Sequence, residues 1–138
     1  MTNATAEWEL QKAIYSELAA DAGVKALIGD PARLYDQVPS SPTYPYVTLG
    51  EAIAVDESTF GKLGQEHIVD VDTWSRYRGS KEAKSIMSAI SAALHEATLT
   101  LSGFDHAGIM LDFSQLLRDP DGITRHGVQK FKSITLEQ

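Results

Sequence analysis

The feature that most constrains this chain is a turn sequence near its C-terminal end, Asp119-Pro120-Asp121-Gly122, which lies between two runs that contain apolar residues. Proline presets φ for an early turn position, glycine accepts a positive φ, and the Asp119 side chain can hydrogen-bond the backbone just ahead of the turn. We therefore predict two antiparallel strands, over about residues 109–118 and 123–136, joined by this turn. Charged side chains of both signs gather at its tip: Arg118, Asp119, Asp121, Arg125 and His126. Such a tip is suited to contact a substrate or another protein.

The length and composition set the class of protein. A chain of 138 residues with 43% hydrophobic content is expected to form one domain, residues 1–138, with a core of its own. The absence of cysteine excludes disulfides and thiolate chemistry. No apolar run approaches the roughly 20 residues of a membrane span, and the first ten residues lack the pattern of a signal peptide. The net charge of −7 disfavours nonspecific binding to nucleic acid, and Lys130 with Lys132 is too small a basic patch to reverse that.

Helical periodicity appears in three places. Residues 7–20 carry apolar side chains on one face, and Thr5 is expected to cap that helix. Asp21 can cap a short second helix that runs to Ile28 and stops at Gly29. The strongest pattern is the apolar stripe of residues 81–97, for which Ser80 is the expected cap.

Strand signals separate these helices. Residues 46–53 and 65–74 have the composition and alternation of strands. The four prolines of residues 30–45 indicate a rigid connector, in which 34–38 can form at most a short edge strand. Residues 54–64, which include Phe60, predict a long loop between the two strands, and loops of that length are usually functional or mobile.

The order of these elements predicts the fold class. Strands occur as consecutive hairpin pairs instead of alternating singly with helices. This order favours an α+β fold with a small antiparallel sheet of about four strands and two main helices packed on one face.

Candidate catalytic and metal sites are weak. The four histidines, His67, His95, His106 and His126, show no zinc-type spacing, and ordinary surface or helix-end positions explain them better. The carboxylates of Asp70 and Asp72 point to the same side of a strand, but no nucleophile or phosphate clamp accompanies them. We therefore predict no enzyme activity, no metal and no cofactor.

A cluster of aromatic and basic residues follows the second strand. Trp74, Arg76, Tyr77 and Arg78 are residue types that dominate the energetics of protein interfaces. A surface turn whose arginine side chains lean on an aromatic ring accounts for the same residues equally well.

Five segments of the chain are similar to one family. They are LYDQVP (34–39), YPYVTLGE (44–51), DTWSR (72–76), ALHEATLTL (93–101) and RDPDGITRHGV (118–128). Together they resemble the phage tail-completion proteins, which include the tail terminators of siphophages and of gene transfer agents. The resemblance runs from the first helix to Glu137, and the combination of segments is more specific than any one of them.

The resemblance implies a structural role in a virion tail. Proteins of this kind form a ring, expected to be a hexamer, at the head-proximal end of the tail tube. The ring stops tail polymerisation, contacts the major tail tube protein and the head–neck connector proteins, and lets DNA pass without specific binding. The implied location is the tail of a phage or gene transfer agent particle, after assembly in the host cytoplasm.

The resemblance also makes particular residues candidates, although it carries over no catalytic ones. Expected contacts with other subunits or the tail tube are Trp74, Arg76, Arg78, Arg118, Asp119, Asp121, Arg125 and His126. Because acidic side chains repel DNA phosphates, the expected lumen-facing residues are Asp56, Glu57, Asp70 and Asp72. A head–tail connector such as a neck stopper is the alternative among virion proteins, and a small-molecule binding or enzymatic domain is the alternative from another class.

Overall fold

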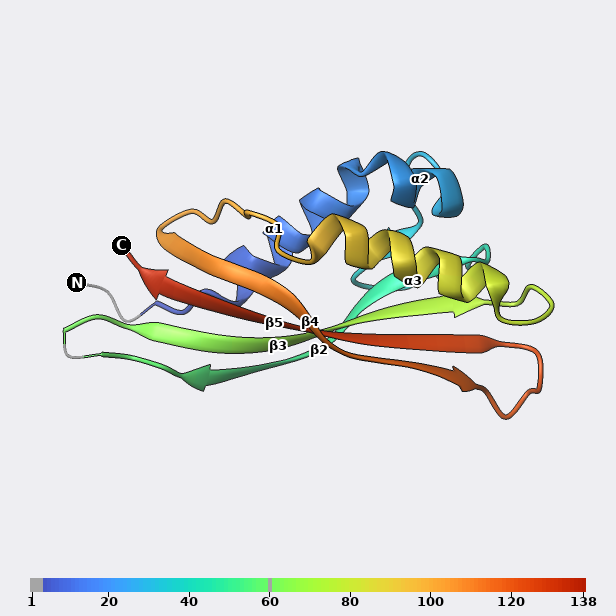
Figure 1. The fold of residues 1–138 in the computed structure, drawn as a ribbon. Coiled ribbons are helices and arrows are strands. Elements are labelled where there is room, and N and C mark those ends of the chain that lie inside the picture. Colours follow the sequence, from blue (N-terminus) through green and yellow to red (C-terminus); the bar gives the residue numbers. More distant parts are fainter. Residues whose placement is uncertain (1–3, 60) are drawn as a thin grey trace.

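A computed structural model describes residues 4–59 and 61–138 of the chain. The helices are α1 (Glu7–Ala20), α2 (Ala22–Ile28) and α3 (Lys81–Leu94), and the strands are β1 (Leu34–Tyr35), β2 (Tyr46–Asp56), β3 (Gly64–Ser75), β4 (Phe104–Arg118) and β5 (Arg125–Glu137). Helices and strands occupy two layers, with all three helices on one side of a long twisted sheet (Figure 1). The predicted α+β class is therefore correct, and the two main helices, α1 and α3, are accompanied by the short α2 that the sequence also predicted.

The sheet has five strands in the order β1-β2-β3-β5-β4, which corrects the expected four. It is also mixed and not purely antiparallel, because Leu34 and Tyr35 of β1 pair in parallel with Val47 and Thr48 of β2. The prolines of the connector keep β1 at two residues and at the edge of the sheet. The remaining pairs are antiparallel, and the last strand, β5, inserts between β3 and β4.

The core lies between the sheet and the helices. From Gln65 to Ser75, strand β3 alternates between buried and partly exposed residues, so that Val69 and Val71 face the helices. Leu10, Ile14 and Leu18 of α1 and Ile86, Ile90 and Leu94 of α3 pack on this side, with Phe131 of β5 completely buried among them. Each such side chain contributes about 1.5–3 kcal/mol on burial.

The helix ends match the predictions in part. Asp21 caps α2 as expected, accepting a hydrogen bond from Val24 N at 2.9 Å, and Gly29 ends that helix with φ of 97°. The expected cap at Thr5 is wrong, because α1 begins after Ala6 and has no side-chain cap. Ser80 does precede α3, but its hydroxyl makes no capping bond. Helix α3 ends at Leu94, three residues before the predicted end, and Glu96 adopts a positive φ of 62°.

The two hairpins extend further than predicted. Strand β2 continues to Asp56 and β3 starts at Gly64, so residues 54–56 belong to a strand and the predicted loop 54–64 shortens to 57–63. Phe60 lies outside the described residues. Strand β4 begins at Phe104, five residues before the predicted start. The two hairpin tips lie at opposite ends of the sheet (Figure 1).

Candidate functional site

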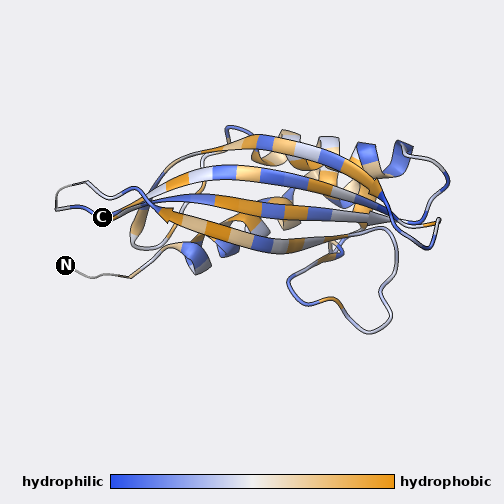
Figure 2. Cartoon of the chain, turned by 90° about the horizontal axis from the view of Figure 1, so that it is seen from below, coloured by the Kyte–Doolittle hydropathy of each residue, from blue (hydrophilic) through white to orange (hydrophobic). Residues whose placement is uncertain are grey.

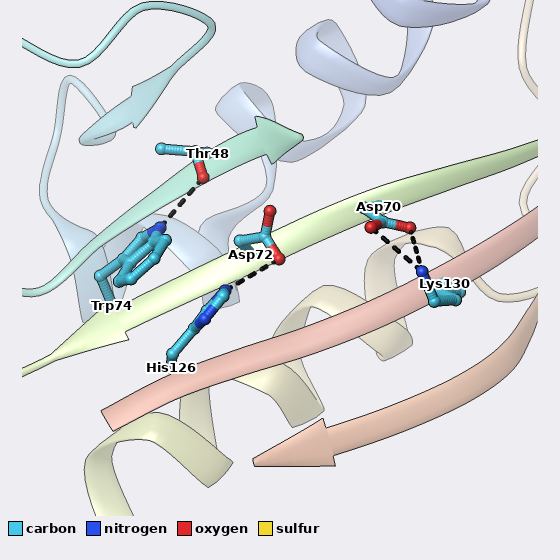
Figure 3. Close-up of polar contacts among 6 residues, drawn as sticks. All are labelled: Thr48, Asp70, Asp72, Trp74, His126 and Lys130. Carbon is cyan, nitrogen blue, oxygen red and sulfur yellow. Dashed lines mark hydrogen bonds and ion pairs between the residues drawn. The ribbon is translucent and has the colours of Figure 1, made fainter. Parts of the chain in front are cut away.

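The side of the sheet that bears no helix carries a row of paired charges and rings (Figure 3). Alternation along β3 places Asp70, Asp72 and Trp74 on this side, and the register brings Lys130 and His126 of β5 opposite Asp70 and Trp74. We call this side the helix-free face.

Trp74 and His126 are the centre of an aromatic cluster. Their rings stack with centroids 3.8 Å apart and planes inclined by 11°, and Tyr46 stacks on Trp74 at 6.3 Å. The Trp74 indole Nε1 donates to Thr48 Oγ1 at 3.0 Å, which fixes the ring across β2 and β3. The two predicted interface residues of this cluster are therefore in direct contact with each other.

His126 also binds one of the predicted lumen residues. Its Nε2 lies 3.1 Å from Asp72 Oδ1, and the two side chains are only 21% and 14% exposed. Burial raises the pKa of Asp72 above its ordinary value, and the hydrogen bond with His126 acts in the opposite direction. Asp72 thus sits in a partly desolvated pair and does not project freely into solvent.

Asp70 is paired as well. Lys130 Nζ donates to its two carboxylate oxygens at 2.9 and 3.1 Å, and this contact raises the pKa of Lys130. Further along the same two strands, Lys132 Nζ lies 3.7 Å from Glu66 Oε1. Each of the three acidic side chains on β3 therefore has a lysine or histidine partner on β5.

Arg76 joins the connector to the hairpin tip. Its guanidinium lies over the Tyr44 ring, 4.3 Å from the centroid, and its Nε donates to Thr124 Oγ1 at 3.1 Å. The interpretation of a surface arginine that leans on an aromatic ring therefore holds for Arg76, with Tyr44 as the ring. Arg78 lies exposed in the same turn.

The hairpin tip is held by Asp121 and not, as expected, by Asp119. Asp121 Oδ1 accepts from the backbone N–H groups of Ile123 and Thr124, each at 2.8 Å, and Oδ2 accepts from the Thr124 hydroxyl at 2.7 Å. These hydrogen bonds, those of Thr124 first, lower the pKa of Asp121 to about 2. Gly122 has the predicted positive φ, 74°.

The other charged residues of the tip surround this turn. Asp119 contributes backbone bonds to Thr124 and Gly122, Arg118 is exposed, and Arg125 Nε donates to the Gly79 carbonyl at 3.3 Å. All eight predicted interface residues thus lie toward one end of the sheet.

The predicted lumen residues fall into two separate places. Asp70 and Asp72 lie in the middle of the helix-free face, whereas Asp56 and Glu57 lie at the opposite tip, where Asp56 Oδ1 accepts from Ser58 N at 3.2 Å. Asp56 pairs with Gln65, which is seven residues before Asp72 on β3, a spacing of about 23 Å.

Two histidines are more buried than expected. His67 is 1% exposed on the side facing the helices, where its Nε2 lies 2.8 Å from Thr135 Oγ1. His106 Nε2 lies 2.7 Å from Ser133 Oγ. Burial lowers the pKa of both imidazoles, because a charged ring is costly away from water. Residues 4–59 and 61–138 hold no group of three or more potential metal ligands.

Sequence reasoning missed several residues of this surface. Lys130 was considered only as part of a small basic patch with Lys132, and strand alternation cannot place it beside Asp70 unless the pairing of β3 with β5 is known. The exposed apolar residues of the outer strands, such as Ile53 and Met110, were also missed. No helix among the described residues is long and apolar enough to cross a membrane.

The fold and the site define an α+β protein whose clustered side chains serve packing and surface contacts. Residues 12–136 match the family model of the tail completion protein gp17, and the chain belongs to this family. It is 30% identical to the tail completion protein gp17 of Bacillus phage SPP1 over 104 residues, which cover 72% of this chain and 77% of that protein. The resemblance seen in the sequence is confirmed.

Structural comparison leads to the same group. A chain of the virion of a native gene transfer agent particle superimposes with a TM-score of 0.89 at 30% identity, covering 99% of this chain and 100% of that one. The relatives are structural components of virions, so the predictions of a non-enzymatic protein and of a location in a virion tail are confirmed.

Proposed function

We propose that the chain is a tail terminator, which forms a hexameric ring at the head-proximal end of the tail tube. The ring stops tail polymerisation and joins the tail to the head–neck complex. The observation that carries the proposal is the full-length similarity to a virion chain, together with membership of the tail completion family. A single domain of this size has a radius of gyration of about 14 Å and cannot surround DNA alone, so the function requires several copies.

The two sides of the sheet support an arrangement around a channel. One side is covered by three helices, and the other bears none (Figure 2). This open side carries exposed apolar side chains, such as Ile53 and Met110, as well as charged ones, such as Asp70 and Lys130. We place the helix-free face toward the lumen, with Asp70 and Asp72 among its residues. Lys130 pairs with Asp70 and His126 with Asp72, so neither carboxylate stands free on this part of the lining.

The repulsive charge of the channel would then come from the tip of the β2–β3 hairpin. Among the described residues, no lysine, arginine or histidine forms an ion pair with Asp56 or Glu57. Six copies would present a ring of uncompensated carboxylates, which repels phosphates and lets DNA slide without binding.

The opposite end of the sheet provides a contact surface. Arg118, Asp119 and Arg125 surround a turn that Asp121 holds rigid, and Arg78 lies exposed beside them. We assign this end, with the Trp74–His126 cluster behind it, to contacts with the tail tube protein or a neighbouring subunit. Mixed charges on a rigid tip favour one register over others.

The experiment is a mass measurement followed by a capping assay. Light scattering over a range of concentrations would show a species of about 90 kDa, six times 15.0 kDa, for a preformed ring. Purified tail tubes are then incubated with the protein and inspected by electron microscopy for rings at one end. Absence of a ring in solution and of capped tubes would overturn the proposal.

A further inference from the structure

Two stretches of strand edge are open at opposite sides of the sheet. Strand β1 covers only Val47 and Thr48 of β2, and among the residues that the structure describes no strand pairs with residues 50–56 on that side. The segment that follows α3 covers the edge of the first half of β4 with two hydrogen bonds. Glu96 N donates to Ile109 O at 2.8 Å, and Leu111 N donates to His95 Nδ1 at 3.0 Å. In the described chain, only β5 hydrogen-bonds to residues 112–118. Open edges are templates for pairing with another chain.

Exposed apolar side chains mark the same two edges. Ile53 and Val55 of β2 are 61% and 52% exposed, and Phe113 and Leu117 of β4 are 44% and 39% exposed. The register places all four on the helix-free face, since Ile53 lies opposite Ile68, and Phe113 and Leu117 lie opposite Lys130 and His126. Joining one edge to the other would place the two apolar pairs side by side and remove them from water.

On the side of the sheet that faces the helices, the residues along the β2 edge and the β4 edge are also compatible with pairing. A groove of about 610 Å³ runs between α3 and β4, and small side chains of α3, including Ser88, Ser91 and Ala92, form its wall. On β2, Ala52 and Ala54 point to the helix side, because they pair with the buried Val69 and His67. A β2 strand laid along β4 would bring these alanines toward the small residues of α3.

The directions of the strands allow the same contact between β4 and β2 to form between every pair of neighbouring copies. Strands β2, β3, β5 and β4 lie side by side in this order, and each is antiparallel to the next. A β2 strand from a second copy in the same orientation would therefore lie antiparallel to β4 of the first copy. The contact uses different surfaces on the two copies, which is the head-to-tail type that closes into rings. Residues 50–56 lie near the β2–β3 tip, whereas residues 112–118 lie near the β4–β5 tip at the other end of the sheet. Each copy must therefore be displaced along the strand direction relative to its neighbour, and a closed barrel of tilted strands requires such a displacement.

We propose that neighbouring copies of this chain join by strand pairing, with residues 112–118 of one copy against residues 50–56 of the next. The inference rests on the proposed function, because it states how the ring closes. The occupant of the β4 edge is then a second copy of the chain, and the helix-free faces form one continuous surface inside the ring.

The test exploits the absence of cysteine in the natural chain. Ile53→Cys and Phe113→Cys are prepared as single variants and treated with a short bismaleimide, alone and mixed, either as the free oligomer or bound to tail tubes. Covalent dimers should form in the mixture at a yield several-fold above that of either variant alone. Two exposed positions on the helical layer, away from both edges and from the charged tip, Glu17→Cys mixed with Ala26→Cys, give the control yield.

The outcomes separate this inference from the proposed function. If wild-type protein forms rings or caps tubes but the Ile53→Cys and Phe113→Cys mixture gives no more dimer than the control, the strand-pairing interface is wrong and the terminator function stands. Dimers in one variant alone would indicate a two-fold contact and overturn the inference too. If wild-type protein forms no ring and caps no tube, both fail. Circular dichroism of each variant confirms that the substitution leaves the fold intact.

Discussion

Trp74 and His126 stack face to face across β3 and β5 at 3.8 Å, and the same imidazole binds Asp72 at 3.1 Å. One histidine thus satisfies a half-buried carboxylate and completes an aromatic cluster. Because the three residues come from two strands separated by more than 50 positions, the cluster ties the last hairpin to the middle of the sheet.

Removing this histidine should weaken the fold through Asp72. His126→Ala deletes the stack and leaves a partly buried carboxylate unpaired, for an expected loss of about 1–3 kcal/mol in the free energy of unfolding. In an Asp72→Asn background the same substitution should be less harmful, since no charge is left behind. Urea unfolding of the four proteins in this double-mutant cycle measures the coupling, and equal losses in both backgrounds would contradict it.

The buried histidines should make the protein sensitive to acid. His67 and His106 have pKa values lowered from 6.5 by burial, so the unfolded chain binds more protons than the folded one once the pH falls below about 6.5. The stability is therefore fully present above that pH and decreases as the pH falls toward the folded-state pKa values. Thermal unfolding between pH 7.5 and 5 measures this slope. His67→Gln, which keeps a polar group for Thr135, should reduce the dependence of the stability on pH. An unchanged dependence would show that His67 does not contribute to it.

The turn aspartate should remain ionised in acid. Hydrogen bonds from Thr124 and Ile123 lower the pKa of Asp121 to about 2, from an ordinary 3.8. A carboxyl-carbon NMR titration should show that midpoint, and Thr124→Ala should move it upward because the substitution removes the hydroxyl that donates to Oδ2. A midpoint near 3.8 in the wild type would show that the turn is not held in this way.

The tip arginines should matter for assembly and not for folding. Arg118→Ala and Arg125→Ala remove charges that lie at the exposed tip, and we expect about tenfold weaker capping of tail tubes, or roughly 1.4 kcal/mol. Electron microscopy over a dilution series of protein gives the apparent affinity. Lys12→Ala on the outer side of α1 is the matched control and should cap normally.

Charge at the β2–β3 tip should affect the passage of DNA. The double variant Asp56→Lys and Glu57→Lys would replace a ring of carboxylates with cations that hold phosphate, so DNA delivery should fall at least several-fold while particles still assemble. Delivery is scored by gene transfer or infection per particle. Glu17→Lys, on the helical side, also makes the net charge more positive and should have little effect on DNA delivery. Normal delivery by the double variant would exclude this tip from the lumen.

The helices and turns could be predicted because their signals are local. The apolar period of α3, the Asp21 cap of α2 and the glycine of the last turn each act within a few residues of one another. The expected cap at Thr5 failed because the α1 terminus is held by tertiary contacts, including Ala6 N to Gln65 Oε1 at 2.9 Å. The loop 54–64 was overestimated because pairing with β3 extends β2 beyond what its own residues indicate.

The sequence alone determined the α+β class, the positions of most elements and the family, since periodicity, turn residues and short motifs are written along the chain. Only the tertiary structure decided the strand order with β5 inside the sheet, the parallel β1 and the partners of Asp70 and Asp72. Asp70 and Lys130 lie 60 positions apart, and their contact depends on which strands pair and in which register. That choice follows from how the whole core packs, and no local stretch of residues encodes it.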